Sequence, residues 1–493
     1  MPKKLLALLL FLASTTTAFA NFDFNANCQQ AYTNILSLKL KRARVLIDQE
    51  KAARPNNAIT VLLDNYYDYF WLLTSESKAD FDRLKDNKSK RLNLLEDEDD
   101  HSPYYNFSLA QVNLQWALIH SRFGENTTAG FEINRAWKLL NANNKKFPGF
   151  LPDDIPRGLV NVLLGALPDG ALKSALSFFG VKGNINTGLN SLQQLASKLP
   201  HTSYAMYYDE LVFYLTYVQS YVLNDPAAYI KMHQYIAQMD SGSLLKTYVR
   251  AFVSLRTGHS SEAIKCLNER PDGGEYQPYP YLTYLEAVAK MNRLDNNADD
   301  YFRRFLAENK GVSYVKDTYL HLAWDAALHG DNKGYQSYIQ QVKAKGYSFN
   351  DKDKQALTEA ANPTPNADLL RARLLFDGGY YDKALDILDG KNPESYPSAG
   401  EKADYYYRLG RVYEAMGKNA NALQNYQQAI NTGKGTPYYY GPMSAVKMGN
   451  IYEEQKNKPE ATHYYNMAIA FKNHQFENSV EQKAKEGLKR LGY

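Results

Sequence analysis

Apolar and small residues recur at a fixed spacing along the C-terminal part of the chain, with polar residues between them. The clearest unit spans Asp404–Asn431, and the segment after it repeats the pattern. The recurring positions are Tyr406, Leu409, Gly410, Tyr413, Gly417, Ala422, Tyr426 and Ala429, and then Ala445, Met448, Gly449, Tyr452, Ala461, Tyr465 and Ala468. Small residues let two antiparallel helices approach closely, and the large residues fill the groove between them. The pattern therefore predicts two helical hairpins, with turns at Gly417–Asn419 and Lys456–Lys458.

Looser copies of this pattern extend through much of the upstream chain. They are marked by Ala372, Gly379, Ala384 and Leu388; by Ala323, Trp324, Gly330 and Tyr335; by Ala251, Gly258, Ala263 and Leu267; and by Ala117, Gly124, Ala129, Ile133 and Ala136. The anchors Ala372, Gly410 and Gly449 are 38 and 39 residues apart. This spacing predicts longer turns than in a consensus repeat of about 34 residues. One such turn is expected at Thr436–Pro442.

These positions make the C-terminal half resemble the tetratricopeptide-repeat superfamily. The resemblance implies an all-α fold, a right-handed superhelical solenoid of degenerate tetratricopeptide-type helical hairpins. Such arrays grow by stacking, because each hairpin buries its apolar face against its neighbours. We therefore expect the array to cover most of the chain beyond residue 20.

A second resemblance is carried by a shorter stretch, 167–192. Its matching residues are Leu167-Pro168, Leu172, Leu176, Phe178, Gly180-Val181, Gly183-Asn184, Gly188-Leu189 and Leu192. The stretch is similar to one in the fungal inclusion body clearance proteins and their animal tetratricopeptide-repeat relatives, which have an aromatic residue in place of Val181. That family is built of irregular helical repeats without recognised enzymatic activity, so the resemblance implies a scaffold or adaptor. Its members act inside eukaryotic cells, whereas the first residues of this chain predict export.

Those first residues have the order of a secretory signal peptide. Lys3 and Lys4 precede the apolar run Leu5–Ala13, and the small-x-small sequence Ala18–Ala20 follows. We expect cleavage before Asn21. The run is shorter than the roughly 20 residues that cross a bilayer, so no transmembrane span is expected in the mature chain.

The environment of the first cysteine bears on the location. Cys28 follows Asn25–Asn27 and not the small apolar residues of a lipobox, so lipid anchoring is not expected. The predicted location is the periplasm or the cell surface of a Gram-negative bacterium. A signal peptide followed by a Tyr- and Asn-rich helical array is similar to exported repeat proteins of the Bacteroidota.

Prolines and glycines set the region Lys145–Leu192 apart. Its most apolar part, Leu159–Leu167, ends at Pro168, which predicts a Pro-broken helical pair packed into the concave side of the solenoid. A membrane-interfacial segment over Leu159–Val181 is the alternative. The predicted organisation is a signal peptide at 1–20, N-terminal helical repeats at 21–144, a Pro/Gly-broken apolar insert at 145–195, degenerate helical repeats at 196–400 and C-terminal tetratricopeptide repeats at 401–493.

Charge and cysteine content narrow the partners. The formal net charge is +4, and no basic cluster of the kind that binds nucleic acid is present, so nucleic acid is not an expected partner. Export makes a disulfide chemically possible. Cys28 and Cys266 nevertheless lie far apart in a fold whose repeats contact mainly their neighbours. We expect both cysteines to be unpaired and buried.

Signatures of catalysis and of metal or cofactor binding are weak. None of the 9 histidines stands in an HExxH pattern, and His321 and His329 lie two helical turns apart, too far to share a metal without outside ligands. The acidic run Glu96–Asp100 lacks the glycine of a calcium loop and fits a solvated turn. Phosphate-binding glycine loops and serine elbows are absent. We therefore expect no enzyme activity, cofactor or metal; an enzyme site assembled from distant residues is the remaining alternative.

The 40 tyrosines are the compositional feature that points to binding. Doublets and triplets stand at Tyr66-Tyr67, Tyr207-Tyr208, Tyr405–Tyr407, Tyr438–Tyr440 and Tyr464-Tyr465. Packing explains Tyr406, Tyr413, Tyr426, Tyr452 and Tyr465, and the other rings are candidates to line a concave groove, since tyrosine offers rigid contact area with a polar tip.

The expected function is that of a non-catalytic scaffold or adaptor that holds a protein or peptide partner in this groove. The alternative is a carbohydrate-capture protein that assists outer-membrane uptake. The sequence assigns no partner-binding residue.

Overall fold

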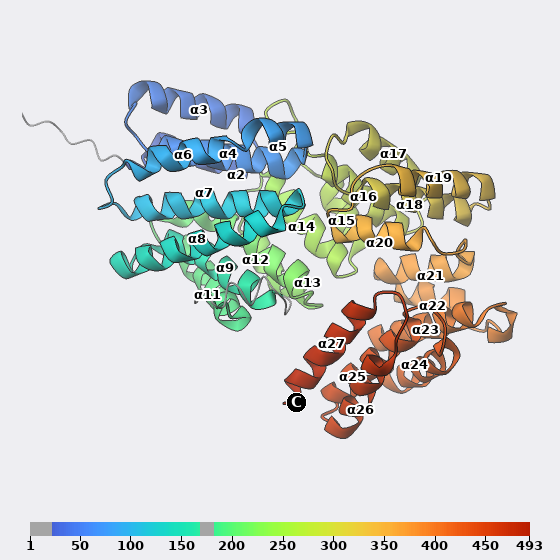
Figure 1. Ribbon diagram of the computed structural model, residues 1–493. Helices are drawn as coiled ribbons and strands as arrows, with labels where there is room; N and C mark the ends of the chain where they lie inside the picture. Colours follow the sequence, from blue (N-terminus) through green and yellow to red (C-terminus); the bar gives the residue numbers. More distant parts are fainter. Residues whose placement is uncertain (1–21, 168–181) are drawn as a thin grey trace, which may run out of the picture. The chain divides into compact units, whose positions relative to one another are not determined.

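The computed structural model describes residues 22–167 and 182–493. These residues fold into helices joined by turns (Figure 1), and their extended backbone pairs at an isolated antiparallel bridge between Ser77 and Gly311. The predicted fold class, an all-α array of tetratricopeptide-type hairpins, is confirmed. The predicted signal peptide lies outside the described residues.

The chain forms two compact units. Unit 1 comprises Met1–Arg256, as far as it is described, with Cys266–Leu282 and Glu308–Ser313; unit 2 comprises Thr257–Lys265, Thr283–Ala307 and Tyr314–Tyr493. The two later pieces of unit 1 return to much earlier helices. The amide of Gln277 donates to the carbonyl of Leu38 at 2.7 Å, and that of Val312 to the carbonyl of Glu76 at 3.1 Å.

Unit 1 is a series of helices in which helices that follow one another in the sequence pack together. The helices are α2 (Ala26–Leu36), α3 (Leu40–Ala53), α4 (Ile59–Ser75), α5 (Lys78–Leu84), α6 (Asn87–Glu96), α7 (Pro103–Arg122), α8 (Asn126–Lys146), α9 (Asp154–Ala166), α11 (Ile185–Lys198), α12 (Tyr208–Tyr217), α13 (Ala228–Ala237) and α14 (Leu244–Arg256). A π-helical turn, Val218–Val222, follows α12. The most extensive contacts join α2 to α3, α7 to α8 and α9 to α11.

The hairpin α7–α8 shows how local sequence sets these boundaries. The side chain of Ser102 caps α7 by accepting from the amide of Tyr104 at 3.2 Å, and Pro103 occupies the first helical position, where its missing N–H costs nothing. Gly124 then adopts a left-handed φ of 84° and ends the helix. The repeat predicted here from Ala117, Gly124 and Ala129 is thus a helical hairpin.

The described part of the predicted Pro/Gly-broken region is a closely packed helical pair, α9 and α11. A Cβ atom on Gly188 would lie 2.5 Å from the carbonyl oxygen of Gly158, so only glycine allows the two backbones this approach. Leu159, Val160 and Val162 are buried within unit 1. Residues 168–181 lie outside the described part of the chain. No helix in the described ranges is long and apolar enough to cross a bilayer.

A carboxyl group is buried in the core of unit 1. Glu210 on α12 is 1% exposed and accepts hydrogen bonds from the hydroxyls of Tyr32 and Tyr66. Burial raises the pKa of Glu210 to about 7, while the hydrogen bonds from Tyr32 and Tyr66 act in the opposite direction. Glu210 is therefore a group that titrates near neutrality inside the fold.

Unit 2 continues the pattern of paired helices. Its helices are α16 (Pro280–Asn292, from Thr283 on), α17 (Ala298–Glu308, as far as Ala307), α18 (Val315–Leu328), α19 (Asn332–Ala344), α20 (Asp351–Glu359), α21 (Ala367–Asp377), α22 (Tyr381–Leu388), α23 (Ala399–Ala415), α24 (Asn419–Gly433), α25 (Tyr440–Glu454), α26 (Lys458–Ala470) and α27 (Glu477–Arg490). Helix α15 (Ser260–Asn268) belongs to unit 2 as far as Lys265. The strongest pairings are α18 with α19, α23 with α24 and α25 with α26.

The two C-terminal hairpins are packed as the sequence predicts. A Cβ on Gly410 would lie 2.5 Å from the ring of Tyr426, and one on Gly449 would lie 2.5 Å from the ring of Tyr465. Both tyrosines have no exposed surface. Each hairpin therefore closes by placing a phenol ring directly on a glycine of the partner helix.

The predicted turn Thr436–Pro442 is wrong at its C-terminal end. Helix α25 already begins at Tyr440, so Pro442 lies in the first helical turn and not in the connection. Proline is tolerated there because the first amides of a helix have no intrahelical acceptor.

Candidate functional site

A pocket of about 310 Å³ lies in unit 2. Its apolar and aromatic walls come from α18, α19, α21 and α25 and from the loops before α21 and α25, and its charged groups come from α20, α21 and α23. The lining residues are Trp324, Tyr335, Glu359, Asn362, Pro363, Thr364, Pro365, Asn366, Leu369, Leu370, Arg373, Ser398, Gly400, Glu401, Asp404, Arg408, Tyr438 and Tyr440.

Helix caps bring the charged groups to this pocket. The side chain of Asn366 accepts from the amides of Asp368 and Leu369 at 3.0 and 3.3 Å, which starts α21. The side chain of Ser398 accepts from the amide of Glu401 at 3.1 Å, which starts α23. Because both helices begin at the pocket, residues of their first turns line it.

The first charged pair joins α20 to α21. The two terminal nitrogens of Arg373 donate to the two carboxylate oxygens of Glu359 at 2.9 and 3.0 Å. The guanidinium group also lies over the ring of Trp324, at 4.6 Å from its centroid. Burial acts to raise the pKa of Glu359, but the charge and hydrogen bonds of Arg373 outweigh it and hold that pKa below its ordinary value.

The second charged pair, Asp404 and Arg408, lies within α23. A single terminal nitrogen of Arg408 faces both carboxylate oxygens of Asp404, at 2.9 and 3.1 Å. Burial raises the pKa of Asp404, and this one-nitrogen contact offsets the burial only in part. The Nε of Arg408 is buried and has no hydrogen-bond acceptor among the described residues.

A third carboxylate, that of Glu401, stands at the start of α23. It accepts a hydrogen bond from the Ser398 hydroxyl at 2.9 Å and forms no ion pair in the part of the chain that the structure describes. Next to it, Gly400 lies under the ring of Tyr438, where a Cβ would come within 2.5 Å of the ring. The ring of Tyr438 stacks on that of Tyr440 at 5.8 Å between centroids.

The structure distributes the surplus tyrosines between this pocket and the core. Tyr438 and Tyr440 line the pocket, whereas Tyr66, Tyr207, Tyr405 and Tyr407 are buried in the helix packing. Sequence reasoning missed the charged residues of the pocket and did not assign Trp324 to it. The i, i+4 spacing of Asp404 and Arg408 was the one local signal of a charged pair.

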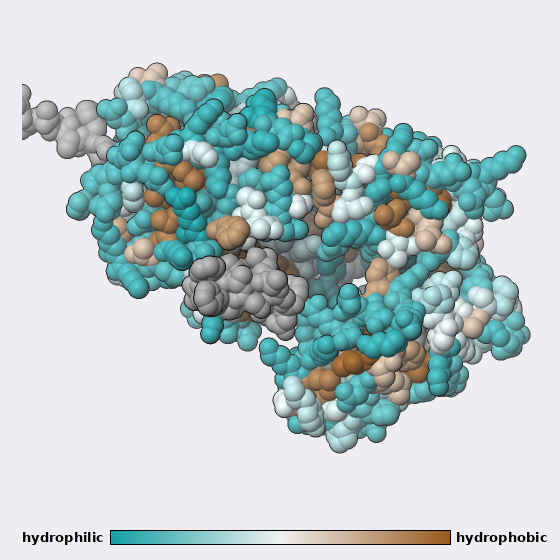
Figure 2. Space-filling model, viewed as in Figure 1, coloured by the Kyte–Doolittle hydropathy of each residue, from teal (hydrophilic) through white to brown (hydrophobic). Residues whose placement is uncertain are grey.

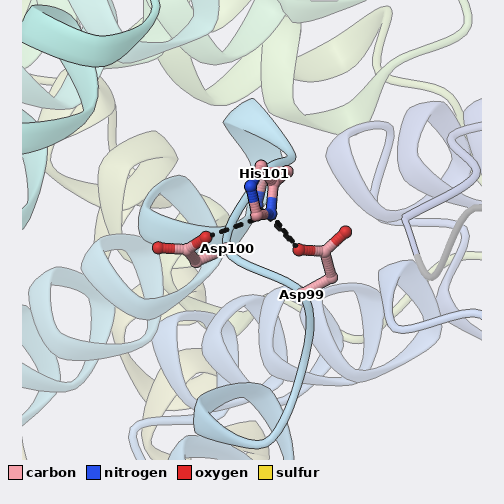
Figure 3. Close-up of side chains that lie close together, drawn as sticks. All are labelled: Asp99, Asp100 and His101. Atoms are coloured by element: carbon pink, nitrogen blue, oxygen red, sulfur yellow. Dashed lines mark hydrogen bonds and ion pairs between the residues drawn. The ribbon is translucent and has the colours of Figure 1, made fainter.

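The other candidates from the sequence are not among the residues that line this pocket. Asp99, Asp100 and His101 come together in an exposed turn after α6 (Figure 3), with the Nδ1 of His101 at 2.6 Å from Asp99 and 3.3 Å from Asp100. His321 is buried and its Nδ1 lies 2.8 Å from the carbonyl oxygen of Asp317 in its own helix. His329 is exposed at the end of α18.

The two cysteines are unpaired and buried, as predicted. Burial raises the pKa of the Cys28 thiol to about 12, and the nearby charge of Glu50 adds to this effect. The thiol therefore stays protonated at neutral pH.

The visible face of the molecule is mainly hydrophilic, with small hydrophobic patches between hydrophilic residues (Figure 2). Among the large hydrophobic side chains that the structure leaves exposed, Ile230, Phe131 and Leu94 belong to separate helices, α13, α8 and α6.

The hairpin beside the pocket is the part of the chain that matches a known family. Residues 403–432 match the tetratricopeptide repeat. The match begins within α23 and ends within α24, so it includes Gly410, Tyr426 and the pocket residues Asp404 and Arg408.

Two solved structures are similar to the chain as a whole. The human IFIT1 dimer with m7Gppp-AAAA has 12% sequence identity and a TM-score of 0.32, over 95% of this chain and 96% of that one. The APC/C hetero-tetramer Cut9-Hcn1 has 11% identity and a TM-score of 0.28, over 92% of this chain and 87% of that one. No curated protein matches the chain. The resemblance of 167–192 to the inclusion body clearance proteins stays a prediction.

Proposed function

We propose that this chain is an exported, non-catalytic scaffold or adaptor, and that the pocket of unit 2 binds a segment of a protein or peptide partner. The tetratricopeptide hairpin at 403–432 supports a protein-binding role. Export to the periplasm or cell surface is proposed on the signal-peptide pattern of residues 1–20.

The observation that carries the proposal is the lining of the pocket. Rigid rings and prolines supply contact area, and paired charges and side-chain amides supply fixed hydrogen-bonding groups, the combination that peptide recognition requires. A volume of about 310 Å³ holds a few side chains and not a globular surface. The partner therefore contributes a short, accessible segment.

Trp324 provides a direct test, because its indole lines the pocket and the other tryptophans, Trp71, Trp116 and Trp137, belong to unit 1. Random dodecapeptides are selected on the full chain from residue 21, and the enriched peptides are titrated against it. We expect saturable binding that changes the emission of Trp324. The change in emission should be absent from the Trp324→Phe variant, which shows that the signal comes from Trp324.

A blocked pocket and a matched control complete the test. Thr364→Tyr adds a phenol ring at the exposed rim of the pocket, and Asn421→Tyr adds the same ring at an exposed position of α24. We expect the first variant to lose peptide binding and the second to keep it. Equal binding by both variants contradicts the assignment to this pocket. Retention of glycans without any enriched peptide favours the carbohydrate-capture alternative instead.

A further inference from the structure

We infer that the pocket of unit 2 takes a basic side chain, lysine or arginine, from the bound segment, with Glu401 as its counter-ion and Tyr438 as the ring beside it. The inference rests on the proposed function, since it names the chemistry of the segment that the pocket binds. Charge, geometry and an unpaired donor support it independently.

The charges that line the pocket favour a cation. Three carboxylates (Glu359, Glu401 and Asp404) face two guanidinium groups (Arg373 and Arg408), and the lining contains neither lysine nor histidine. Each guanidinium group is already bound to a carboxylate. The lining has one carboxylate more than it has guanidinium groups, and this excess negative charge disfavours an anionic ligand. A cation meets Glu401 without breaking any pair.

Glu401 has the coordination capacity for this role. Its carboxylate accepts one hydrogen bond, from the Ser398 hydroxyl to Oε2, and Oε1 accepts none from the described residues. A carboxylate offers about four acceptor positions. The ammonium group of a lysine or the fork of an arginine can occupy the unused ones.

Tyr438 adds the second recognition element. Gly400, the residue before Glu401, has no side chain. The ring of Tyr438 can therefore lie directly on the first turn of α23. The face of a phenol ring attracts a cation within about 6 Å of its centroid and also contacts the aliphatic stem of lysine or arginine. Neighbouring carboxylate and ring together select a long basic side chain over a small cation.

The Nε of Arg408 indicates where the backbone of the bound segment lies. Arg408 lines the pocket, and its Nε is a buried donor without an acceptor among the described residues. Buried donors are almost always paired in folded proteins. A carbonyl oxygen of the bound peptide satisfies this donor without competing for the Asp404–Arg408 pair.

Glu401 also has a structural role, which the test has to separate from binding. It is the third residue of α23, in the position of a capping box with Ser398. Glutamine fills this position as well as glutamate does. Glu401→Gln therefore removes the charge and keeps the cap.

The experiment repeats the dodecapeptide selection on four full-length chains: the wild type, Glu401→Gln, Glu401→Lys and the control Glu454→Lys. Glu454 is exposed at the far end of α25 from the pocket. We expect lysine or arginine to be enriched at one aligned position with the wild type and the control. The enrichment should disappear with Glu401→Gln and change to aspartate or glutamate with Glu401→Lys.

A titration with the consensus peptide then measures how much the contact between Glu401 and the basic residue of the peptide contributes to binding. Changing its basic residue to glutamine, or Glu401 to glutamine, should each weaken binding about tenfold, the effect of one charge-assisted hydrogen bond. The two changes together should weaken binding no further, because they remove the same contact. Arg408→Lys should weaken binding of both peptides equally, since it acts on the peptide backbone.

The outcomes separate the two proposals. A consensus without a basic residue, bound equally by the wild type and Glu401→Gln, overturns this inference and leaves peptide binding in the pocket intact. Failure to enrich any peptide contradicts the proposed function itself.

Discussion

At the scale of single residues, the pair Glu359–Arg373 determines the shape of the pocket. Arg373 uses both terminal nitrogens for Glu359 and places its flat face on Trp324. We predict that Glu359→Gln lowers the free energy of unfolding of unit 2 by about 2 kcal/mol, because it leaves a largely buried guanidinium group without its counter-ion.

The measurement is denaturant unfolding of a fluorotryptophan-labelled chain, followed by fluorine NMR at Trp324. In the double variant Glu359→Gln with Arg373→Met, no buried charge is left unpaired, so the loss should be smaller than in the single variant. If the single and double variants have the same free energy of unfolding, the unpaired charge of Arg373 is not the cause of the loss.

At the scale of secondary-structure elements, the closeness of α23 and α24 depends on Gly410. The ring of Tyr426 occupies the position where a side chain at 410 would begin. We predict that Gly410→Leu overpacks this contact and destabilises unit 2 by about 1–3 kcal/mol. Ala415→Leu on the exposed face of the same helix is the matched control and should change stability little. An unchanged melting temperature of Gly410→Leu would count against the repeat register.

The elements were also the part of the fold that local sequence determines best. Gly410 and Tyr426 belong to neighbouring helices, so their spacing alone predicts the hairpin. The end of the turn before α25 was mispredicted because Pro442 reads as a helix breaker, although the first turn of a helix tolerates it. The pattern of small residues shows which positions of two helices pack together. A proline restricts only the backbone of its own position and of the one before it, so it does not show where a helix begins.

At the scale of the whole molecule, the sequence did not predict which distant segments come together. The pocket combines Trp324, Glu359 and Tyr440, which lie on separate elements and share no local pattern. The return of residues 266–282 to unit 1 depends on tertiary hydrogen bonds such as Gln277 to Leu38. Tyrosine abundance did indicate a binding surface, but only burial separates Tyr438 from Tyr405.

The two units should respond differently to pH. In unit 1, burial raises the pKa of Glu210 and of Asp153 to about 7 and that of Asp209 to about 6. In unit 2, burial raises the pKa of Asp353 to about 6 and also raises those of Asp325 and Asp404, whereas the pKa values of Asp317 and Glu359 are lowered despite burial. Both carboxyl groups whose pKa is raised to about 7, Glu210 and Asp153, thus lie in unit 1.

The sign of the effect follows from proton linkage. Between their unfolded pKa values near 4 and their folded values of about 6 to 7, these three groups of unit 1 bind more protons in the native state than in the unfolded chain. The stability that they contribute is therefore complete at low pH and is lost as the pH rises. Glu210 alone accounts for about 3 kcal/mol of this change. The lowered carboxyl groups of unit 2 change protonation only below pH about 4.5. Asp353 acts in the same direction as Glu210, but its pKa is raised less, so unit 2 loses less stability as the pH rises.

We therefore predict that raising the pH from 5 to 8 lowers the melting temperature of unit 1 more than that of unit 2. Fluorine resonances of Trp71, Trp116 and Trp137 report on unit 1 and that of Trp324 on unit 2. Glu210→Gln removes one of the two carboxyl groups of unit 1 whose pKa is raised to about 7, so it should reduce the pH dependence of unit 1 and leave that of unit 2 unchanged. Parallel shifts of both units, or a rise for unit 1, would mean that Glu210 is not held as a buried, titrating carboxyl group.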